Sequence, residues 1–185
     1  MIQCVGSRED QHPYCSRVCC QQAIKNALHI KHISPATQVY VLYRDMRAYG
    51  LMEHDYRRAR AAGVVFLPYT PERKPQVITD GGVLRGSIDS GLPGDRLTLA
   101  PDLLVLSTGI VSGDNGPLAR LLKTPLTQDG FYLEAHAKLR PLDFAVDGIF
   151  LCGLAHSPRN IEESIAQAQG AAVRAGSILS REYLE

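Results

Sequence analysis

The sequence contains no long apolar run, no excess of charge of one sign and no secretion signal. Its longest apolar runs, such as 103–106 and 149–152, are far shorter than the roughly 20 residues that a membrane-spanning helix needs. Because 20 Lys and Arg side chains are matched by 19 Asp and Glu, no basic field is present to attract nucleic acid or an anionic membrane. The first ten residues lack the basic and apolar segments of a signal peptide. We therefore expect a soluble, cytoplasmic chain that keeps its thiols reduced and binds neither nucleic acid nor a membrane.

A G-x-G-x-x-G turn is also missing, although a Rossmann domain normally begins with one. The 185 residues nevertheless include 45% apolar side chains, which is enough to build the core of one large domain or two small ones. We therefore expect the chain to begin in the middle of a fold. The N-terminal FAD-binding half of any flavin site would then lie on absent sequence or on another polypeptide.

Strand and helix patterns alternate along the first 70 residues, in the order strand, helix, strand, helix, strand. The expected strands are 1–5, 38–43 and 64–68, and the expected helices are 16–30 and 53–62. This order is typical of parallel strands joined by crossover helices. From 71 to 102 the composition shifts to Pro, Gly and short apolar groups, which predicts a small antiparallel sheet.

The remaining residues predict two more strands and two more helices. A buried strand is expected at 103–107, a short helix at 118–122, an apolar strand at 149–152 and a long helix at 160–180. The long helix carries an apolar stripe of small residues at spacings of three and four. The sequence therefore predicts an α/β fold with a Rossmann-like parallel sheet and a small antiparallel β insertion.

Four of the five cysteines lie within the first twenty residues, at Cys4, Cys15, Cys19 and Cys20. Clustered soft thiolates suit an iron-sulfur cluster, a zinc ion or redox-active thiols, whereas an odd, clustered set does not suggest a disulfide framework. Structural zinc favours paired ligands a few residues apart, which adjacent cysteines fit badly. An iron-sulfur cubane has corners in four directions, so it tolerates cysteines that point in different directions better than one small ion does.

Cys152 stands alone in an apolar segment, so we expect it to be a core residue.

Four segments resemble the flavin-containing A subunit of heterodisulfide reductases and related polyferredoxins: 2–8, 14–20, 42–47 and 147–158. The resemblance extends over essentially the whole chain. It implies part of a two-domain flavoprotein reductase fold, similar to thioredoxin reductase, with FAD and a [4Fe-4S] cluster. In this family the cysteines of the first segments hold the cluster, so Cys4, Cys15, Cys19 and Cys20 are its expected ligands. Residues 1–100 would form the inserted pyridine-nucleotide-type domain with the cysteines, and 101–185 the returning FAD segment.

The resemblance also implies contacts with FAD. Those expected are Thr108, Gly109, Gly153, Leu154, Ala155, Ser157, Ile161 and Glu162. Leu154 departs from the flavoprotein pattern, because it stands where an Asp normally holds the ribityl chain. The N-terminus of the long helix offers unpaired N–H groups and a positive dipole end, which would stabilise negative charge on a flavin. Glu162 and Glu163 are equally explained as ordinary first-turn residues, and His156 either donates to a flavin or caps its loop.

Four arginines have two interpretations each. Arg44 and Arg47 follow a predicted strand, where they could contact the phosphate of a dinucleotide or serve a structural role. Arg8 and Arg17 flank the cysteines and could offset the negative charge of a cluster or lie on the solvated surface.

Three functional hypotheses follow. In the first, the chain passes electrons between FAD and a [4Fe-4S] cluster. Its partners would be other heterodisulfide reductase-like subunits or ferredoxin- or hydrogenase-type electron donors. Flavin-based bifurcation is implied by analogy only. In the second, the chain is a pyridine-nucleotide-dependent thiol-disulfide oxidoreductase in which Cys15 and Cys19 or Cys20 form the dithiol. In the third, it is a cofactor-free assembly module.

Overall fold

The computed structural model describes residues 1–89 and 96–180, which form two compact units. The first unit comprises Met1–Gly109 and the second Ile110–Glu185. Each unit has its own buried apolar cluster.

The first unit contains a parallel sheet whose strand order is β3-β2-β1-β7. The strands are β1 (Ile2–Val5), β2 (Tyr40–Tyr43), β3 (Val65–Pro68) and β7 (Leu106–Thr108). The central strand β1 pairs in parallel with both β2 and β7, through Ile2 opposite Leu42 and Leu106. All these strands end at the same edge of the sheet, and this edge carries the site described below.

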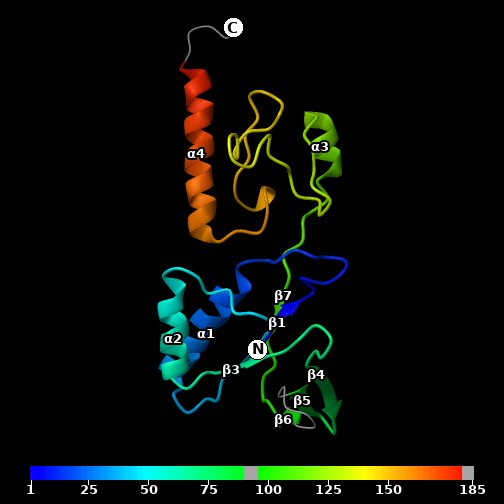
Figure 1. Cartoon of the computed structure of the whole chain (residues 1–185), viewed down its shortest axis with the longest axis vertical. Coiled ribbons are helices and arrows are strands. Elements are labelled where there is room, and N and C mark those ends of the chain that lie inside the picture. The colour runs from blue at the N-terminus through cyan, green and yellow to red at the C-terminus, as the bar shows by residue number, and fades with distance from the viewer. Residues whose placement is uncertain (90–95, 181–185) are drawn as a thin grey trace. The chain divides into compact units, whose positions relative to one another are not determined.

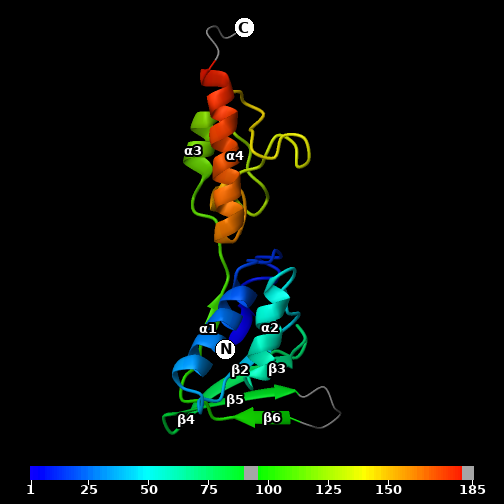
Figure 2. The ribbon, with the colours of Figure 1, turned by 90° about the vertical axis from the view of Figure 1, so that its left-hand side faces the viewer.

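The helices α1 (Cys19–Ile33) and α2 (Met52–Ala61) lie side by side and connect β1 to β2 and β2 to β3 (Figures 1 and 2). Both bury small or branched side chains against the sheet, because such side chains allow close helix-to-sheet packing. Their shared core contains Ala23, Ile24, Ala27, Val39, Val41, Ala48, Ala59 and Val64. This β-α-β-α-β arrangement confirms the predicted one.

A small antiparallel sheet, in the order β4-β5-β6, follows β3. It consists of β4 (Gln76–Asp80), β5 (Val83–Asp89) and β6 (Arg96–Leu99). The β4–β5 hairpin turns at Gly81 and Gly82, which both have positive φ as a two-residue turn of this kind requires. Ile88 of β5 packs in a second core cluster with Ile2 and Leu42 of the parallel sheet. The predicted fold class, a parallel sheet with a small antiparallel insertion, is therefore confirmed.

The second unit is built mainly of loops around a small core. Its regular elements are α3 (Gly116–Leu122), the short 3-10 helix η1 (Gly153–Ala155) and α4 (Ile161–Leu179). Its core consists of Ala119, Tyr132, Phe144 and Leu151. The side chain of Asn160 accepts a hydrogen bond from the backbone N–H of Glu163, whose carboxylate accepts one from the Asn160 N–H. This capping box fixes the start of α4 one residue after the predicted start.

Three predictions about single elements differ from the structure. The apolar segment 149–152 is not a strand; it forms only one isolated bridge, between Asp143 and Phe150, because no described strand lies beside it. The strand predicted at 103–107 begins later, at Leu106, and is an edge strand of the sheet rather than a buried one; Leu103, which precedes it, is 75% exposed. Cys152 is only partly buried rather than a core residue, because its neighbour Leu151 takes the core position.

None of the described helices combines the length and the apolar character needed to cross a membrane.

Candidate metal centre

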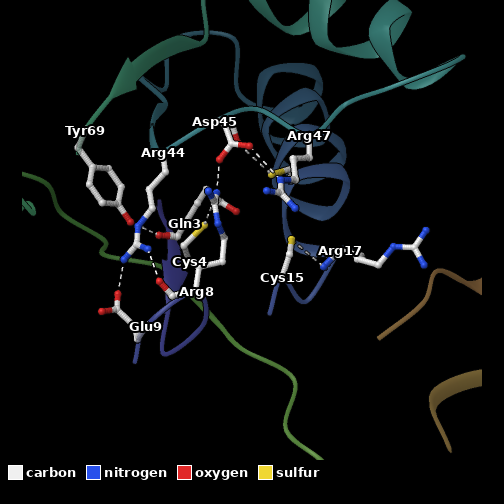
Figure 3. Close-up of polar contacts among 11 residues, drawn as sticks. Gln3, Cys4, Arg8, Glu9, Cys15, Arg17, Arg44, Asp45, Arg47 and Tyr69 are labelled. Carbon is white, nitrogen blue, oxygen red and sulfur yellow. Dashed lines mark hydrogen bonds and ion pairs between the residues drawn. The ribbon is translucent and has the colours of Figure 1, made fainter. Parts of the chain in front are cut away.

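Four cysteines that the sequence singled out line one pocket of the first unit, and Figure 3 shows two of them, Cys4 and Cys15. The other lining residues are Ser7, Arg8, Ser16, Arg17, Asp45 and Arg47. Cys4 lies near the end of the central strand β1, Cys15 lies in the loop that follows, and Cys19 and Cys20 are the first residues of α1. Because the end of β1 and the start of α1 meet at the same edge of the sheet, the fold brings these thiols together. All of them are free thiols.

The backbone around the cysteines is irregular. Cys4, Arg8 and Arg17 have φ values of 61°, 59° and 62°, in the left-handed region that residues other than glycine rarely adopt. Such residues cost about 1–3 kcal/mol each and persist only where the surroundings fix them. The left-handed Arg17 delays the start of α1 from the predicted Ser16 to Cys19. This irregular turn allows the adjacent Cys19 and Cys20 to line the same pocket.

Burial dominates the electrostatics of the thiols. Desolvation, followed by repulsion from the thiolates of Cys20, Cys15 and Cys4, raises the pKa of Cys19 to about 11. Burial likewise raises the pKa of the Cys20 thiol. Cys19 and Cys20 therefore stay protonated near neutral pH unless positive charge enters the pocket, and a bound metal supplies such charge.

Positive groups lie close to the two cysteines that precede α1. The Arg8 guanidinium lies 4.0 Å from the sulfur of Cys4, and the backbone N–H of Arg17 donates to the sulfur of Cys15 at 3.3 Å. The hydrogen bond to Asp45, together with the nearby Cys15, raises the pKa of Arg47, which also lines the pocket. The interpretation of Arg8 as a residue that offsets thiolate charge therefore has a structural basis.

Arg44 serves a structural role rather than reading a phosphate. Its side chain is only 6% exposed, forms an ion pair with Glu9 and stacks over the ring of Tyr69. It also donates to the carbonyl oxygen of Arg8 at 2.6 Å, and Lys74 forms a second ion pair with Glu9 at 2.6 Å. These contacts brace the loop that carries Cys15.

The four thiols share a pocket but do not converge on a single point. Among residues 1–89 and 96–180, no three His, Cys, Asp or Glu side chains are close enough to one another to hold one metal ion. The ligands of a multi-iron cluster are farther apart than those of a single ion, because the iron and sulfide atoms lie between them. The donor set therefore fits a cluster better than a mononuclear site.

The predicted flavin contacts are distributed over both units. Thr108 and Gly109 end β7 in the first unit, where the carbonyl oxygen of Thr108 lies 3.9 Å from the sulfur of Cys19. The others lie in the second unit: Gly153, Leu154 and Ala155 form η1, Ser157 follows it, and Ile161 and Glu162 begin α4. Leu154 is 52% and Ile161 78% exposed, so apolar surface is available at the start of α4.

A hydrogen-bond network around His156 fixes the loop between η1 and α4. The Nδ1 atom of His156 accepts from Arg159 at 2.8 Å and from the side-chain amide of Gln167 at 3.1 Å. The ring proton must therefore be on Nε2, which donates to Glu134 at 2.8 Å. The amide oxygen of Gln167 in turn accepts from the backbone N–H of Gly153 at 2.8 Å. Of the two predicted roles for His156, the structure therefore supports that of holding its loop.

No protein-family model matches the chain, but curated proteins with similar sequences are named as A subunits of heterodisulfide reductases. The chain is 39% identical over 184 residues to the A subunit of the ferredoxin:CoB-CoM heterodisulfide reductase of Methanosarcina acetivorans, with 97% of this chain and 23% of that protein covered. It is 42% identical over 179 residues to the iron-sulfur A subunit of the CoB-CoM heterodisulfide reductase of Methanocaldococcus jannaschii, with 92% of this chain and 27% of that protein covered.

The chain belongs to the family of heterodisulfide reductase A subunits. It spans about a quarter of the length of these curated relatives. A third member, from Methanococcus maripaludis, is named as the A subunit of an H2/formate:CoB-CoM heterodisulfide,ferredoxin reductase and is 41% identical over 178 residues. The resemblance inferred from the sequence is therefore confirmed.

The fold of this chain also resembles a known flavoprotein reductase. The crystal structure of T. acidophilum thioredoxin reductase matches with a TM-score of 0.52 and 14% sequence identity, covering 86% of this chain and 48% of that one. At this identity the match shows the fold alone. It agrees with the predicted flavoprotein reductase architecture.

Sequence reasoning did not assign Asp45 to the site and gave Arg47 a different role. Both line the cysteine pocket, because they follow β2, whose end lies beside the end of β1. The signal was present in the sequence: carboxyl ends of parallel neighbouring strands meet at one edge, so the residues after β2 had to lie near Cys4.

Proposed function

We propose that the cysteine pocket holds a [4Fe-4S] cluster, with Cys4, Cys15, Cys19 and Cys20 as its ligands, and that the chain passes electrons between this cluster and FAD. The observation that carries the proposal is that all four thiols, from three segments of the chain, line one pocket. The name of the M. jannaschii relative, which calls it an iron-sulfur subunit, agrees with this proposal. When bound, the cluster supplies one-electron transfer, and the flavin links it to two-electron chemistry.

The residues of this chain would bind the cluster and balance its charge. Four thiolates bring four negative charges to a pocket in which burial already disfavours ionised thiols. Arg8, near the sulfur of Cys4, and Arg47, which lines the same pocket, offset part of that charge. The burial of Cys4 and Cys20 keeps water from their sulfurs.

For FAD, we propose contacts from Thr108 and Gly109 and from the loop and helix start in the second unit. The latter are Gly153, Leu154, Ala155, Ser157, Ile161 and Glu162. The N-terminus of α4 is suited to an anionic or electron-rich group, because its first N–H groups and its dipole favour negative charge. The exposed Leu154 and Ile161 offer apolar surface beside it. In this proposal 1–100 is the inserted pyridine-nucleotide-type domain and 101–185 the returning FAD segment.

We also propose that the chain works as a part of a heterodisulfide reductase-like complex, as an oxidoreductase whose partners include other subunits and ferredoxin- or hydrogenase-type donors. The names of the relatives include ferredoxin, H2 and formate beside the heterodisulfide. Coupled reduction of a heterodisulfide and a ferredoxin by flavin-based bifurcation is the corresponding hypothesis for the whole complex.

The alternative, a dithiol oxidoreductase, is disfavoured by the thiol pKa values. A thiol exchanges disulfides as its thiolate, and a pKa of about 11 leaves Cys19 almost fully protonated at neutral pH. The thiols of such enzymes have lowered rather than raised pKa values.

The test is anaerobic purification of the chain, followed by iron, sulfide and zinc analysis and low-temperature EPR of the dithionite-reduced protein. We expect about four irons and four sulfides per chain. Cys19→Ala should lose them, whereas Cys152→Ala, which changes the one cysteine outside the pocket, should retain them. Metal-free protein with titratable thiols would contradict the proposal and favour the dithiol enzyme, and one zinc per chain would make the site structural.

A further inference from the structure

Asp45 lies between two arginines of the cysteine pocket, Arg8 and Arg47 (Figure 3). Its Oδ1 atom forms an ion pair with Arg8, and its Oδ2 atom accepts from the Nε of Arg47 at 2.9 Å. The same Nη1 atom of Arg8 lies 4.0 Å from the sulfur of Cys4, and Arg47 lines the pocket together with Cys15. One carboxylate therefore joins two cationic groups that line the pocket but come from different segments, the loop after β1 and the segment after β2.

We infer that Asp45 is a positioning residue, which holds the guanidinium groups of Arg8 and Arg47 in the cysteine pocket and so raises the reduction potential of the bound cluster. The inference rests on the proposed cluster. Its basis is the bridging geometry, in which each oxygen of one carboxylate is used by a different arginine.

The two arginines need an ion-pair partner to stay in the pocket, because their side chains are long and not deeply buried. The side chain of Arg47 is 42% exposed and that of Arg8 is 24% exposed. Without a partner, a flexible side chain at such a site gains rotamer entropy and hydration by extending into water. The Asp45 carboxylate offsets that tendency for both arginines at once.

The direction in which the reduction potential changes when the Asp45 carboxylate is removed shows whether Asp45 acts by positioning the arginines or only by its charge. Asp45 carries a negative charge, so if it acted only as a charge, its removal would favour the reduced, more negative cluster and raise the potential. If it positions the arginines, its removal lets two cations leave the sulfurs and lowers the potential. The backbone of Asp45 also contacts the site, since its carbonyl oxygen lies 4.0 Å from the sulfur of Cys20, but a side-chain substitution leaves this contact in place.

The experiment uses the anaerobically purified chain, with iron analysis and an EPR-monitored redox titration. The variants are Asp45→Asn, Arg8→Gln, Arg47→Gln, the double variant of the two arginines and the triple variant of all three residues. Asp55→Asn is the matched control, because Asp55 forms an ordinary surface ion pair with Arg58 on α2. We expect each arginine variant and Asp45→Asn to lower the equilibrium constant for reduction by about tenfold, which is about 59 mV for a one-electron couple. The triple variant should have a higher potential than the double variant, and Asp55→Asn should match the wild type.

A higher potential for Asp45→Asn than for the wild type would overturn the inference, because the carboxylate would then act as a charge alone. An arginine variant with unchanged potential would overturn it too, even if Asp45→Asn did not fold. Wild-type protein without iron and sulfide would instead reject the proposed cluster, and with it the inference, so the two failures are distinguishable.

Discussion

Replacing Gly109 with alanine should disturb the cysteine pocket from outside it. Gly109 follows β7, and a Cβ atom at this position would lie 2.8 Å from the carbonyl oxygen of Gly6 and 3.0 Å from the Cβ of Ser7. The first contact is with backbone, so no side-chain rotation relieves it. The turn must move instead, and it follows Cys4 directly. We expect Gly109→Ala to lower the free energy of unfolding by about 1–3 kcal/mol, the usual cost of overpacking, and to reduce the iron retained by the chain.

Equilibrium urea unfolding and iron analysis of the purified variant would measure both effects. Gly113→Ala is the control, since a Cβ atom there meets nothing within 4 Å, and its unfolding free energy should change by less than about 0.5 kcal/mol. If the two variants had the same stability and iron content, the close approach of Gly109 to the Gly6 turn would not be what holds Cys4, and our account of the pocket wall would be wrong.

Three further substitutions test the fold and its charges. Ile24→Ala, in the core between α1 and the sheet, should cost about 2–5 kcal/mol in urea unfolding, whereas Ile33→Ala, at an exposed position of the same helix, should cost less than about 0.5 kcal/mol. Asn160→Ala removes the cap of α4 and should cost about 0.5–2 kcal/mol, with Asn160→Asp retaining most of the stability; equal loss in both would contradict the capping role. The hydrogen bond from Lys74 lowers the pKa of Glu9 from its usual 4.5, so this carboxylate contributes stability above that value and loses it as the pH falls through the lower folded-state pKa. Glu9→Gln should therefore be less stable than the wild type near about pH 7 and equally stable at strongly acidic pH, as urea midpoints would show; a difference independent of pH would refute the ion pair.

The periodic parts of the fold were predictable because local patterns decide them. Alternating strand and helix signals predicted the order of β1, α1, β2, α2 and β3, since crossover helices between parallel strands leave few other arrangements. The segment 149–152 misled the prediction, because an apolar run shows burial but does not show whether a partner strand exists. Leu103 misled it in the same way, since the sequence does not show which strand lies at the edge of the sheet.

The cysteine pocket was predictable only in part. Thiol chemistry and family resemblance selected the four cysteines, and the structure brings them into one pocket. The bridging of Arg8 and Arg47 by Asp45 depends on side chains that follow β2 meeting the loop that follows β1, and neither hydrophobic periodicity nor cysteine spacing carries that information. The left-handed Arg17, which sets the start of α1, likewise follows from tertiary contacts and not from helix propensity.

The contact between Cys19 and Thr108 has a consequence for the biosynthesis of the protein. The two residues are 89 positions apart, yet the sulfur of one lies beside the carbonyl oxygen of the other. During translation, all four cysteines leave the ribosome long before β7 is made, and the central strand β1 then has only one of its two neighbours. The four thiols are therefore synthesised well before the strand whose Thr108 carbonyl oxygen lies beside Cys19, so this part of their surroundings is added last.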